Sequence, residues 1–250
     1  MNRKLLTIAG GVAAVAVAAF AVWFFFIRSD APEAVSLEGA VDTLRTPTSA
    51  GQAAASGTAT PGAPSASGGA EKGIDGTWTV ASAGETFVGY RVKEELAQVG
   101  ATTAVGRTSD VRGTVTIAGG VVQPGSSFTA NLQTLKSDRS QRDNALRRQA
   151  LETDVFPNAT FTLGDAVTLP SAFAGGEPLS TSLRGKLELH GVTRDVEIPV
   201  EAKVENGFIV VVGSLEIQFA DYNIAQPRAA IVLSVEDRGV MEFQLVLQKQ

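Results

Sequence analysis

The residues that could carry out acid–base or metal chemistry are few in this chain. His190 is the only histidine among 250 residues, and cysteine is absent. These counts exclude a thiolate nucleophile, a disulfide framework and a metal site with several histidines. The sequence places no nucleophile beside His190, which directly precedes Gly191, so we interpret it as a turn histidine. We therefore predict no catalytic residue, no metal and no cofactor.

A cluster of arginines could instead recognise the polar end of a ligand. Guanidinium groups match the oxygens of phosphate or quinone headgroups, and we predict Arg139 and Arg142 as the headgroup contacts. The alternative is a solvated helix face, which the interleaved carboxylates favour. The cluster consists of Arg139, Arg142, Arg147 and Arg148, and its acidic neighbours are Asp138, Asp143, Glu152 and Asp154.

The overall charge argues against nucleic acid as a partner. The chain has 21 basic and 26 acidic residues, which gives a formal net charge of −5. Nucleic-acid-binding domains usually present a strongly basic face, and this balance does not supply one. We predict that nucleic acid is not a partner.

The elements that must position these side chains have a period of two. Residues 183–190 alternate apolar and polar side chains, and residues 195–204 repeat the pattern, as half-buried antiparallel strands do. Asn206-Gly207 between two apolar runs predicts a type I′ hairpin that pairs Val204 with Ile209. Further strands are predicted at Thr77–Ser82, Thr86–Lys93, Ala101–Gly106, Val111–Ala118, Ser126–Leu135, Ala159–Leu163, Ala229–Glu236 and Val240–Lys249.

One segment, residues 137–156, breaks the alternation and predicts a helix. Ser137 or Asp138 is the predicted N-cap, and the helix should end before Pro157. Its apolar face consists of Leu146, Ala150 and Leu151. About ten strands with one or two short helices predict an all-β antiparallel barrel, of about eight strands, with a short helical lid.

The predicted register leaves one apolar stripe on the outside of the barrel. If Ile209 faces inward, then Phe208, Val210 and Val212 face outward. Such a stripe can be covered by the protein's own elements, form the contact surface of a homodimer, or touch lipid. We expect the protein's own elements to cover it.

An unbroken apolar run occupies residues 5–27 and is long enough to cross a bilayer as a helix. Arg3 and Lys4 precede it, which predicts a single-pass protein of the cell membrane with residues 28–250 outside the cytoplasm. A cleaved signal peptide is the alternative. Its apolar core would be shorter and would end in small residues, whereas this run ends in the bulky residues Trp23 to Phe26.

The segment after this run, residues 28–73, predicts a linker between the membrane and a folded domain. From Thr46 to Ala70 every residue except Gln52 is Ala, Gly, Ser, Thr or Pro. Such a composition cannot bury enough apolar surface to order the chain, so we predict disorder. The folded domain should then comprise residues 74–250.

Two motifs in the predicted domain resemble the YceI-like family. The first, R-D-x-x-L followed by F-P-x-x-x-F, consists of Arg142, Asp143, Leu146, Phe156, Pro157 and Phe161. The second, G-x-L-x-L-H-G-V-T-R, runs from Gly185 to Arg194, and weaker likenesses lie at Trp78-Thr79-Val80 and at Asp221 to Ile224. The resemblance covers all of 74–250. It implies a lipocalin-like barrel, usually extracytoplasmic, that holds a polyisoprenoid or similar amphiphile and has no established catalytic reaction.

The chain departs from the family pattern at two positions. Phe219 stands where the family often has arginine, which removes a possible ion pair at that end of the barrel. Asn223 replaces a frequent glycine. Because asparagine tolerates a left-handed backbone, we expect the turn to be retained.

An eight-stranded barrel can be filled by side chains or can hold one small ligand. Small residues are predicted among the inward positions, where they should leave volume: Gly113, Ala130, Gly185, Ala202 and Gly213. The predicted ligand-binding residues of the lumen are Val115, Phe128, Leu132, Phe161, Leu187, Val200, Val211, Leu215, Leu233 and Phe243.

Three hypotheses for the function remain open at this point. The first is a membrane-anchored protein that carries or stores an isoprenoid lipid or prenyl quinone. The second is a non-enzymatic interaction module with a filled barrel, which presents the Phe208 stripe or the lid to a partner. The third is a hydrolase or isomerase that uses His190 with an acidic residue. We rank them in this order.

Overall fold

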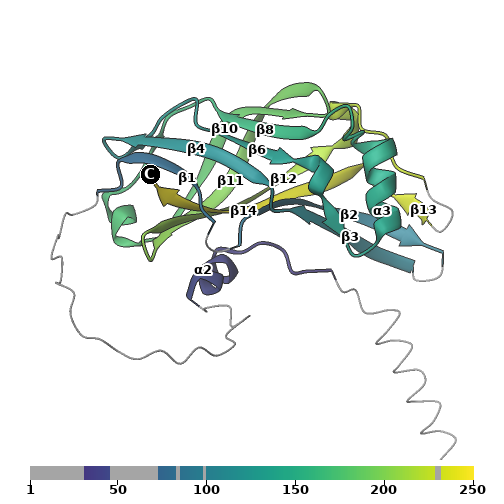
Figure 1. Cartoon of the computed structure of the whole chain (residues 1–250), viewed down its shortest axis with the longest axis horizontal. Helices are drawn as coiled ribbons and strands as arrows, with labels where there is room; N and C mark the ends of the chain where they lie inside the picture. Colours follow the sequence, from purple (N-terminus) through teal and green to yellow (C-terminus); the bar gives the residue numbers. More distant parts are fainter. Residues whose placement is uncertain (1–30, 46–72, 83–84, 98–99, 229–231) are drawn as a thin grey trace, which may run out of the picture.

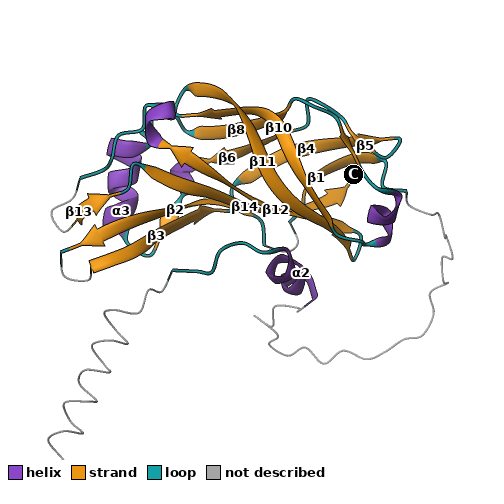
Figure 2. Cartoon of the chain, turned by 180° about the vertical axis from the view of Figure 1, so that it is seen from behind, coloured by secondary structure: helices purple, strands orange, loops and turns teal. Residues whose placement is uncertain are grey.

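The described residues form a closed antiparallel barrel of eight strands, which confirms the predicted architecture. The computed structural model describes residues 31–45, 73–82, 85–97, 100–228 and 232–250. The strands follow one another in the order β1, β4, β6, β8, β10, β11, β12 and β14, which returns to β1 (Figures 1 and 2). Their bounds are β1 (Gly76–Val80), β4 (Val111–Ala118), β6 (Ser127–Asn131), β8 (Asn158–Leu163), β10 (Leu179–Leu189), β11 (Val192–Glu205), β12 (Phe208–Gln218) and β14 (Arg238–Lys249).

Strand β14 links the barrel to a second group of strands. Its residues 247–249 pair with β1, whereas residues 240–244 pair with β2. Strand β2 continues into β3, which pairs with β7, and the end of β2 pairs with β13. The strands outside the circuit are β2 (Phe87–Leu96), β3 (Gly100–Thr108), β5 (Val121–Val122), β7 (Lys136–Ser137), β9 (Val167–Thr168) and β13 (Val232–Val235).

The alternating segments have the faces that the sequence predicts. Leu187 and Leu189 of β10 are buried, while Glu188 between them is exposed. Val204 pairs with Ile209 across the hairpin, and both turn residues have positive φ, 51° at Asn206 and 81° at Gly207, as a type I′ turn requires. Asn223 is also left-handed, with φ of 56°, so the turn expected there is retained.

The predicted lid is shorter than the sequence indicates and begins with a different cap. Helix α3 (Ser140–Ala145) continues into a π-helical turn, η3 (Leu146–Ala150). The prediction of Ser137 or Asp138 as N-cap is wrong, because Arg139 holds that position without a side-chain cap bond. The Ser137 hydroxyl and backbone N–H instead donate to Asp143, at 2.6 and 2.9 Å. The remaining short helices are η2 (Leu132–Thr134), η4 (Ser171–Gly175) and η5 (Phe219–Tyr222).

Part of the predicted linker is a helix that packs on the barrel. Disorder over 28–73 is the wrong prediction for α2 (Leu37–Arg45), which lies against the outside of β12. Its buried residues are spaced to form one apolar face, and this face covers Val210 and Val212. The buried residues of α2 are Leu37, Ala40 and Val41. The expectation that the protein's own elements cover the outer stripe is therefore confirmed for Val210 and Val212, while Phe208 is half-buried.

Two predicted segments lie outside the described residues. These are the membrane span at 5–27 and the Ala/Gly/Ser/Thr/Pro-rich stretch from Thr46 to Ala70. Among the helices in the described ranges, none has the length and apolar character needed to cross a bilayer.

Aromatic rings reduce the open volume in one part of the barrel interior. The inward glycines were expected to leave open volume, but Phe128 lies over Gly113, and a Cβ added there would be 2.1 Å from its ring. Phe161 and Phe243 cover two further inward glycines in the same way. The core in this part includes Trp78, Ile117, Ile198, Ile209, Leu245 and Leu247. The larger free volume therefore lies beneath the lid.

Candidate ligand cavity

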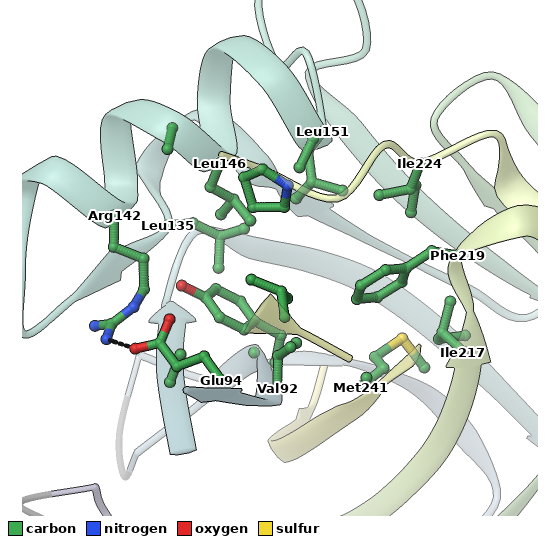
Figure 3. Close-up of a pocket in the computed structure, with 18 of the residues that line it drawn as sticks. Val92, Glu94, Leu135, Arg142, Leu146, Leu151, Ile217, Phe219, Ile224 and Met241 are labelled. Atoms are coloured by element: carbon green, nitrogen blue, oxygen red, sulfur yellow. Dashed lines mark hydrogen bonds and ion pairs between the residues drawn. The ribbon is translucent and has the colours of Figure 1, made fainter. Parts of the chain in front are cut away.

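A cavity of about 180 Å³ lies at the end of the barrel that the lid covers. The inner faces of β2, β3 and β14, the ends of β12 and β13, and the lid provide its walls (Figure 3). One water molecule needs roughly 10–15 Å³ of comparable volume, so the cavity accepts a group of many atoms. Its apolar walls include Val92, Leu135, Leu146, Leu151, Ile217, Phe219, Ile224 and Met241.

An ion pair between Glu94 and Arg142 lies in the wall of this apolar cavity (Figure 3). The Arg142 side chain is 14% exposed and that of Glu94 is 7% exposed. Arg142 also donates to Asp138 through Nη1. Burial lowers the pKa of Arg142, but the hydrogen bond and charge of Glu94 outweigh it, so this pKa lies above its ordinary value. Arg142 Nε is buried and has no hydrogen-bond partner among the described residues.

The hydroxyl of Tyr90 is a second buried polar group without a hydrogen-bond partner in the described part of the chain. Burial raises the pKa of Tyr90 to about 12, although the positive charge of Arg142 acts in the opposite direction. The nearby Ser137 hydroxyl also acts to lower this pKa, but it donates to Asp143 at 2.6 Å and its position does not meet hydrogen-bond geometry with Tyr90. Tyr90 therefore offers a neutral hydroxyl donor in the cavity wall.

Tyr90 can occupy this position because its cross-strand partner is a glycine. Gly106 pairs with Tyr90 across β2 and β3. A Cβ added at Gly106 would lie 2.4 Å from Cε1 of the tyrosine ring, well inside van der Waals contact. The absence of a side chain at Gly106 thus fixes the place of the ring.

A smaller cavity of about 70 Å³ lies deeper in the barrel. Phe128, Phe161 and Phe243 are among its walls. Val88, Ala159 and Met241 line both cavities, so the two are neighbours. Methionine is unbranched and adapts its shape readily, which makes Met241 the most movable of the three shared residues.

Nine of the ten predicted lumen residues lie inside the protein, in three environments. Leu132 lines the larger cavity. The residues that line the smaller cavity are Phe128, Phe161, Leu187, Val211 and Phe243. Val115, Val200 and Leu215 pack in the core and line neither cavity.

The prediction that Leu233 faces the lumen is wrong, since the residue is 64% exposed. Strand β13 has a register irregularity between Val232 and Ser234, where it pairs with the end of β2. This irregularity breaks strict alternation and turns Leu233 outward. Val232 and Val235 of the same strand line the cavity.

Both predicted headgroup arginines lie at the cavity, but their side chains differ in exposure and in their acidic partners. The Arg139 side chain is 46% exposed, and its Nε lies 3.6 Å from Asp138. Arg142 is held between Glu94 and Asp138. Each guanidinium therefore already has an acidic partner, which agrees with the interleaved carboxylates seen in the sequence.

Two polar residues of the cavity, Tyr90 and Glu94, were not predicted. Along β2 the period of two places Val88, Tyr90 and Val92 on the cavity side, with Glu94 next in the series. The predicted strand ended at Lys93. A longer strand with a period of two would have placed Glu94 on the inner face, although its partner Arg142 is 48 residues away.

His190 lines neither cavity, and its ring makes contacts that stabilise the turn in which it lies. Its Nδ1 donates to the Tyr222 carbonyl at 2.9 Å, and its Nε2 lies 3.1 Å from Glu152 Oε2. The Phe156 ring packs edge-on against it, with 4.5 Å between ring centroids. The backbone of His190 is left-handed, with φ of 52°, in the turn that precedes Gly191.

An antiparallel barrel of eight strands with an apolar cavity under a helical lid belongs to the lipocalin-like class of folds. The family model of the YceI-like domain matches residues 78–247. This chain belongs to the YceI-like family, as its motifs predicted.

Solved structures that are similar to this chain share little sequence with it. A polyisoprenoid-binding domain from Saccharophagus degradans, implicated in plant cell wall breakdown, is 17% identical, with a TM-score of 0.53 over 69% of this chain and 98% of its own. BcnA of Burkholderia cenocepacia is 18% identical, with a TM-score of 0.49 over 64% and 95%. The YceI protein of Campylobacter jejuni is 17% identical, with a TM-score of 0.47 over 58% and 85%. No curated protein matches the chain.

Proposed function

We propose that this protein carries or stores an isoprenoid lipid or prenyl quinone in its barrel. The observation behind the proposal is the 180 Å³ cavity, which combines largely apolar walls with buried polar groups around Glu94 and Arg142. Transfer of an apolar chain from water into such walls is favourable by about 25 cal/mol per Å² of buried area. The Saccharophagus degradans domain of the same fold is described as polyisoprenoid-binding, which supports this choice of ligand.

The size of the cavity sets how such a ligand can be held. An apolar protein cavity of about 150 Å³ accepts benzene, so the larger cavity alone holds only a short part of a prenyl chain. The smaller cavity of 70 Å³ lies behind Met241. We propose that a bound tail displaces the Met241 side chain and occupies both cavities.

The polar groups in the wall favour an uncharged headgroup. Glu94 and Asp138 already balance Arg142, so a phosphate would add negative charge beside two carboxylates. A quinone carbonyl or an alcohol oxygen can instead accept from the unpartnered Tyr90 hydroxyl and from Arg142 Nε–H. We place the headgroup beside these two donors.

The location and the absence of a reaction are also part of the proposal. The apolar run at 5–27, preceded by Arg3 and Lys4, supports a membrane anchor with the barrel outside the cytoplasm. His190 has both ring nitrogens engaged and lines neither cavity, which supports a binding protein without catalysis. Helix α2 covers the stripe that an interaction module would present.

The proposal is tested on the full chain, purified from membranes in mild detergent. Organic extraction and mass spectrometry should recover a prenyl quinone or polyprenol bound near one per chain. Ile217→Arg places a charge in the cavity wall and should abolish this recovery, whereas Glu216→Arg on the exposed neighbouring position should not. Absence of any bound or exchangeable prenyl lipid in the parent chain would refute the carrier function.

A further inference from the structure

Residues 31–45, which we call the strap, cross the outside of the barrel before its first strand. Figures 1 and 2 show α2 outside the barrel, where it packs against β11 and β12. Val210 is 0% exposed and Val212 is 4% exposed, because the apolar face of α2 covers them. The strap is therefore part of the folded unit.

The beginning of the strap is fixed by a buried charge cluster on β2, β3 and β14. Glu242 is 1% exposed and accepts from Arg91 Nε at 2.6 Å and from Arg107 Nη2 at 2.8 Å. Both arginines also donate to the strap backbone, at the carbonyl of Glu33, and Arg91 donates to that of Pro32. These backbone carbonyls accept hydrogen bonds from guanidinium N–H groups that do not bond to Glu242.

The end of the strap is fixed at a second point. Arg45 Nε and Nη2 donate to the two carboxylate oxygens of Glu205 at 3.0 and 3.1 Å, a two-pronged pair. The strap is thus attached at both ends and along its helix. It begins on β2 and β3 and ends beside the hairpin between β11 and β12.

Because the strap is attached to the barrel, the segment before the strap determines the distance between the barrel and the membrane. Only residues 28–30 separate the apolar run at 5–27 from Ala31, and a chain of this length spans at most about 14 Å. The stretch 46–72 has both ends on the barrel, at Arg45 and before β1. Its length therefore has no influence on how far the barrel lies from a span that ends at Ile27.

We infer that the strap holds the cavity-bearing side of the barrel against the bilayer surface, so that the barrel does not move freely on a long tether. Arg91 contacts the strap from the outer face of β2, and its neighbours Tyr90 and Val92 line the cavity from the inner face. The part of the barrel nearest the lipid is thus the part with the cavity. This inference rests on the proposed membrane anchor.

The test compares two insertions in the full chain, reconstituted in nanodiscs. The chain lacks cysteine, so Ser182→Cys on the exposed face of β10 accepts one fluorescent donor, and the lipids carry the acceptor. About twenty Gly/Ser residues add a root-mean-square reach of about 25 Å. Inserted after Ser29, they should lower energy transfer several-fold. Inserted within 46–72, they should leave it unchanged.

The opposite pattern, in which only the insertion within 46–72 lowers transfer, would overturn the inference. A variant with a weakened strap provides a second test of the two insertions. Val41→Asp with Arg45→Glu removes the helix and end contacts and leaves only the exposed bonds from Arg91 and Arg107 to the strap backbone. We expect these bonds to open once α2 is undocked, so that the insertion within 46–72 now lowers transfer as well. No response in this variant would also count against the strap.

Docking of the strap on the barrel is measured separately from anchoring of the chain in the membrane. In detergent, hydrogen exchange of the α2 amides should be slow in the parent chain and fast in the Val41→Asp, Arg45→Glu variant. Fast exchange in the parent would overturn the strap even if the chain is anchored. Slow exchange in a chain that alkaline washing removes from membranes would instead refute the anchor and leave docking intact.

Discussion

At the scale of single residues, the cavity depends on where polar atoms are left without partners. The hydroxyl of Tyr90 and Nε of Arg142 are both buried in the cavity wall and unpartnered among the described residues. A buried donor without an acceptor costs about 1–3 kcal/mol, so a ligand oxygen placed there would recover part of that cost. The residue-scale predictions follow from this arrangement.

Replacing Tyr90 with Phe should weaken binding of a prenyl quinone roughly three- to tenfold, which corresponds to about 0.5–1.5 kcal/mol for one lost hydrogen bond. Titration calorimetry in detergent would measure the change. Tyr222→Phe is the matched control, because Tyr222 also has a buried, unpartnered hydroxyl but lines neither cavity. Equal effects of the two substitutions would count against a headgroup contact at Tyr90.

The ionisation of Tyr90 provides a second measurement on the same site. Burial raises its pKa to about 12, so the neutral form stabilises the fold fully below pH 10 and this contribution is lost as the pH rises through 12. Tyr90 and Tyr222 are the only tyrosines, and the pKa of Tyr222 is raised as well. Phenolate absorbance should therefore stay low at pH 10, and the step near pH 12 should be smaller in Tyr90→Phe.

Gly106→Ala should reduce ligand binding without unfolding the barrel. The new Cβ would lie 2.4 Å from the Tyr90 ring, and the ring can only move toward the cavity that it lines. We expect at least a tenfold weaker affinity, or about 1.4 kcal/mol. Gly175→Ala is the control, since an added Cβ there meets nothing within 4 Å. Unchanged binding in Gly106→Ala would show that the ring has other space available.

At the scale of elements, strict alternation made β10 and β11 predictable, whereas the local pattern of α2 is weaker. Its apolar positions Leu37, Ala40 and Val41 follow helical spacing, and Ser36 Oγ accepts from the Gly39 N–H at 3.2 Å. A nine-residue helix with so few apolar residues is marginal alone. Packing on β12 stabilises it, and that contact joins residues far apart in the sequence.

The same reasoning explains what was missed in the cavity. A period of two assigns each strand side chain to the inside or the outside. Of the predicted lumen residues, however, only Leu132 lines the larger cavity, while five line the smaller one. The position of Glu94 depends on Arg142 in the lid, and the exposure of Leu233 depends on an irregularity in a four-residue strand. The period of two along β2 could have placed Glu94 on the inner face, but neither its pairing with Arg142 nor the irregularity beside Leu233 leaves a local signal in the sequence.

The end of the strap at Arg45 should loosen at low pH. Hydrogen bonds from Arg45 and then Lys203 lower the pKa of Glu205 to about 2. Its contribution is therefore present above the ordinary value of 4.5 and is lost as the pH falls through 2. Amide chemical shifts of α2 should change over this window, and Glu205→Gln should remove that part of the change. An identical profile in Glu205→Gln would assign strap release to other groups.

At the scale of the whole molecule, aromatic rings leave only the smaller cavity in one part of the barrel, and the larger cavity lies under the lid. The two cavities share Met241, so the length of the bound chain should depend on that residue. Met241→Trp would block the passage, while Met241→Leu nearly conserves volume. The tryptophan variant should retain short prenyl chains and lose preference for long ones, measured by competition between prenyl alcohols of two lengths. Equal loss of both lengths would show that the tail does not enter the smaller cavity.

Strand β14 has a consequence for how cargo could enter and leave. Residues 240–244 pair with β2 beside the cavity, whereas the circuit of eight strands closes through 247–249 and β1. Separation of β2 from β14 would therefore open a lateral gate while every ladder of that circuit stays intact. Such an opening is a local event, far less costly than global unfolding. Lipid exchange would then not require unfolding of the barrel. A loaded and an empty molecule would have the same eight-stranded barrel.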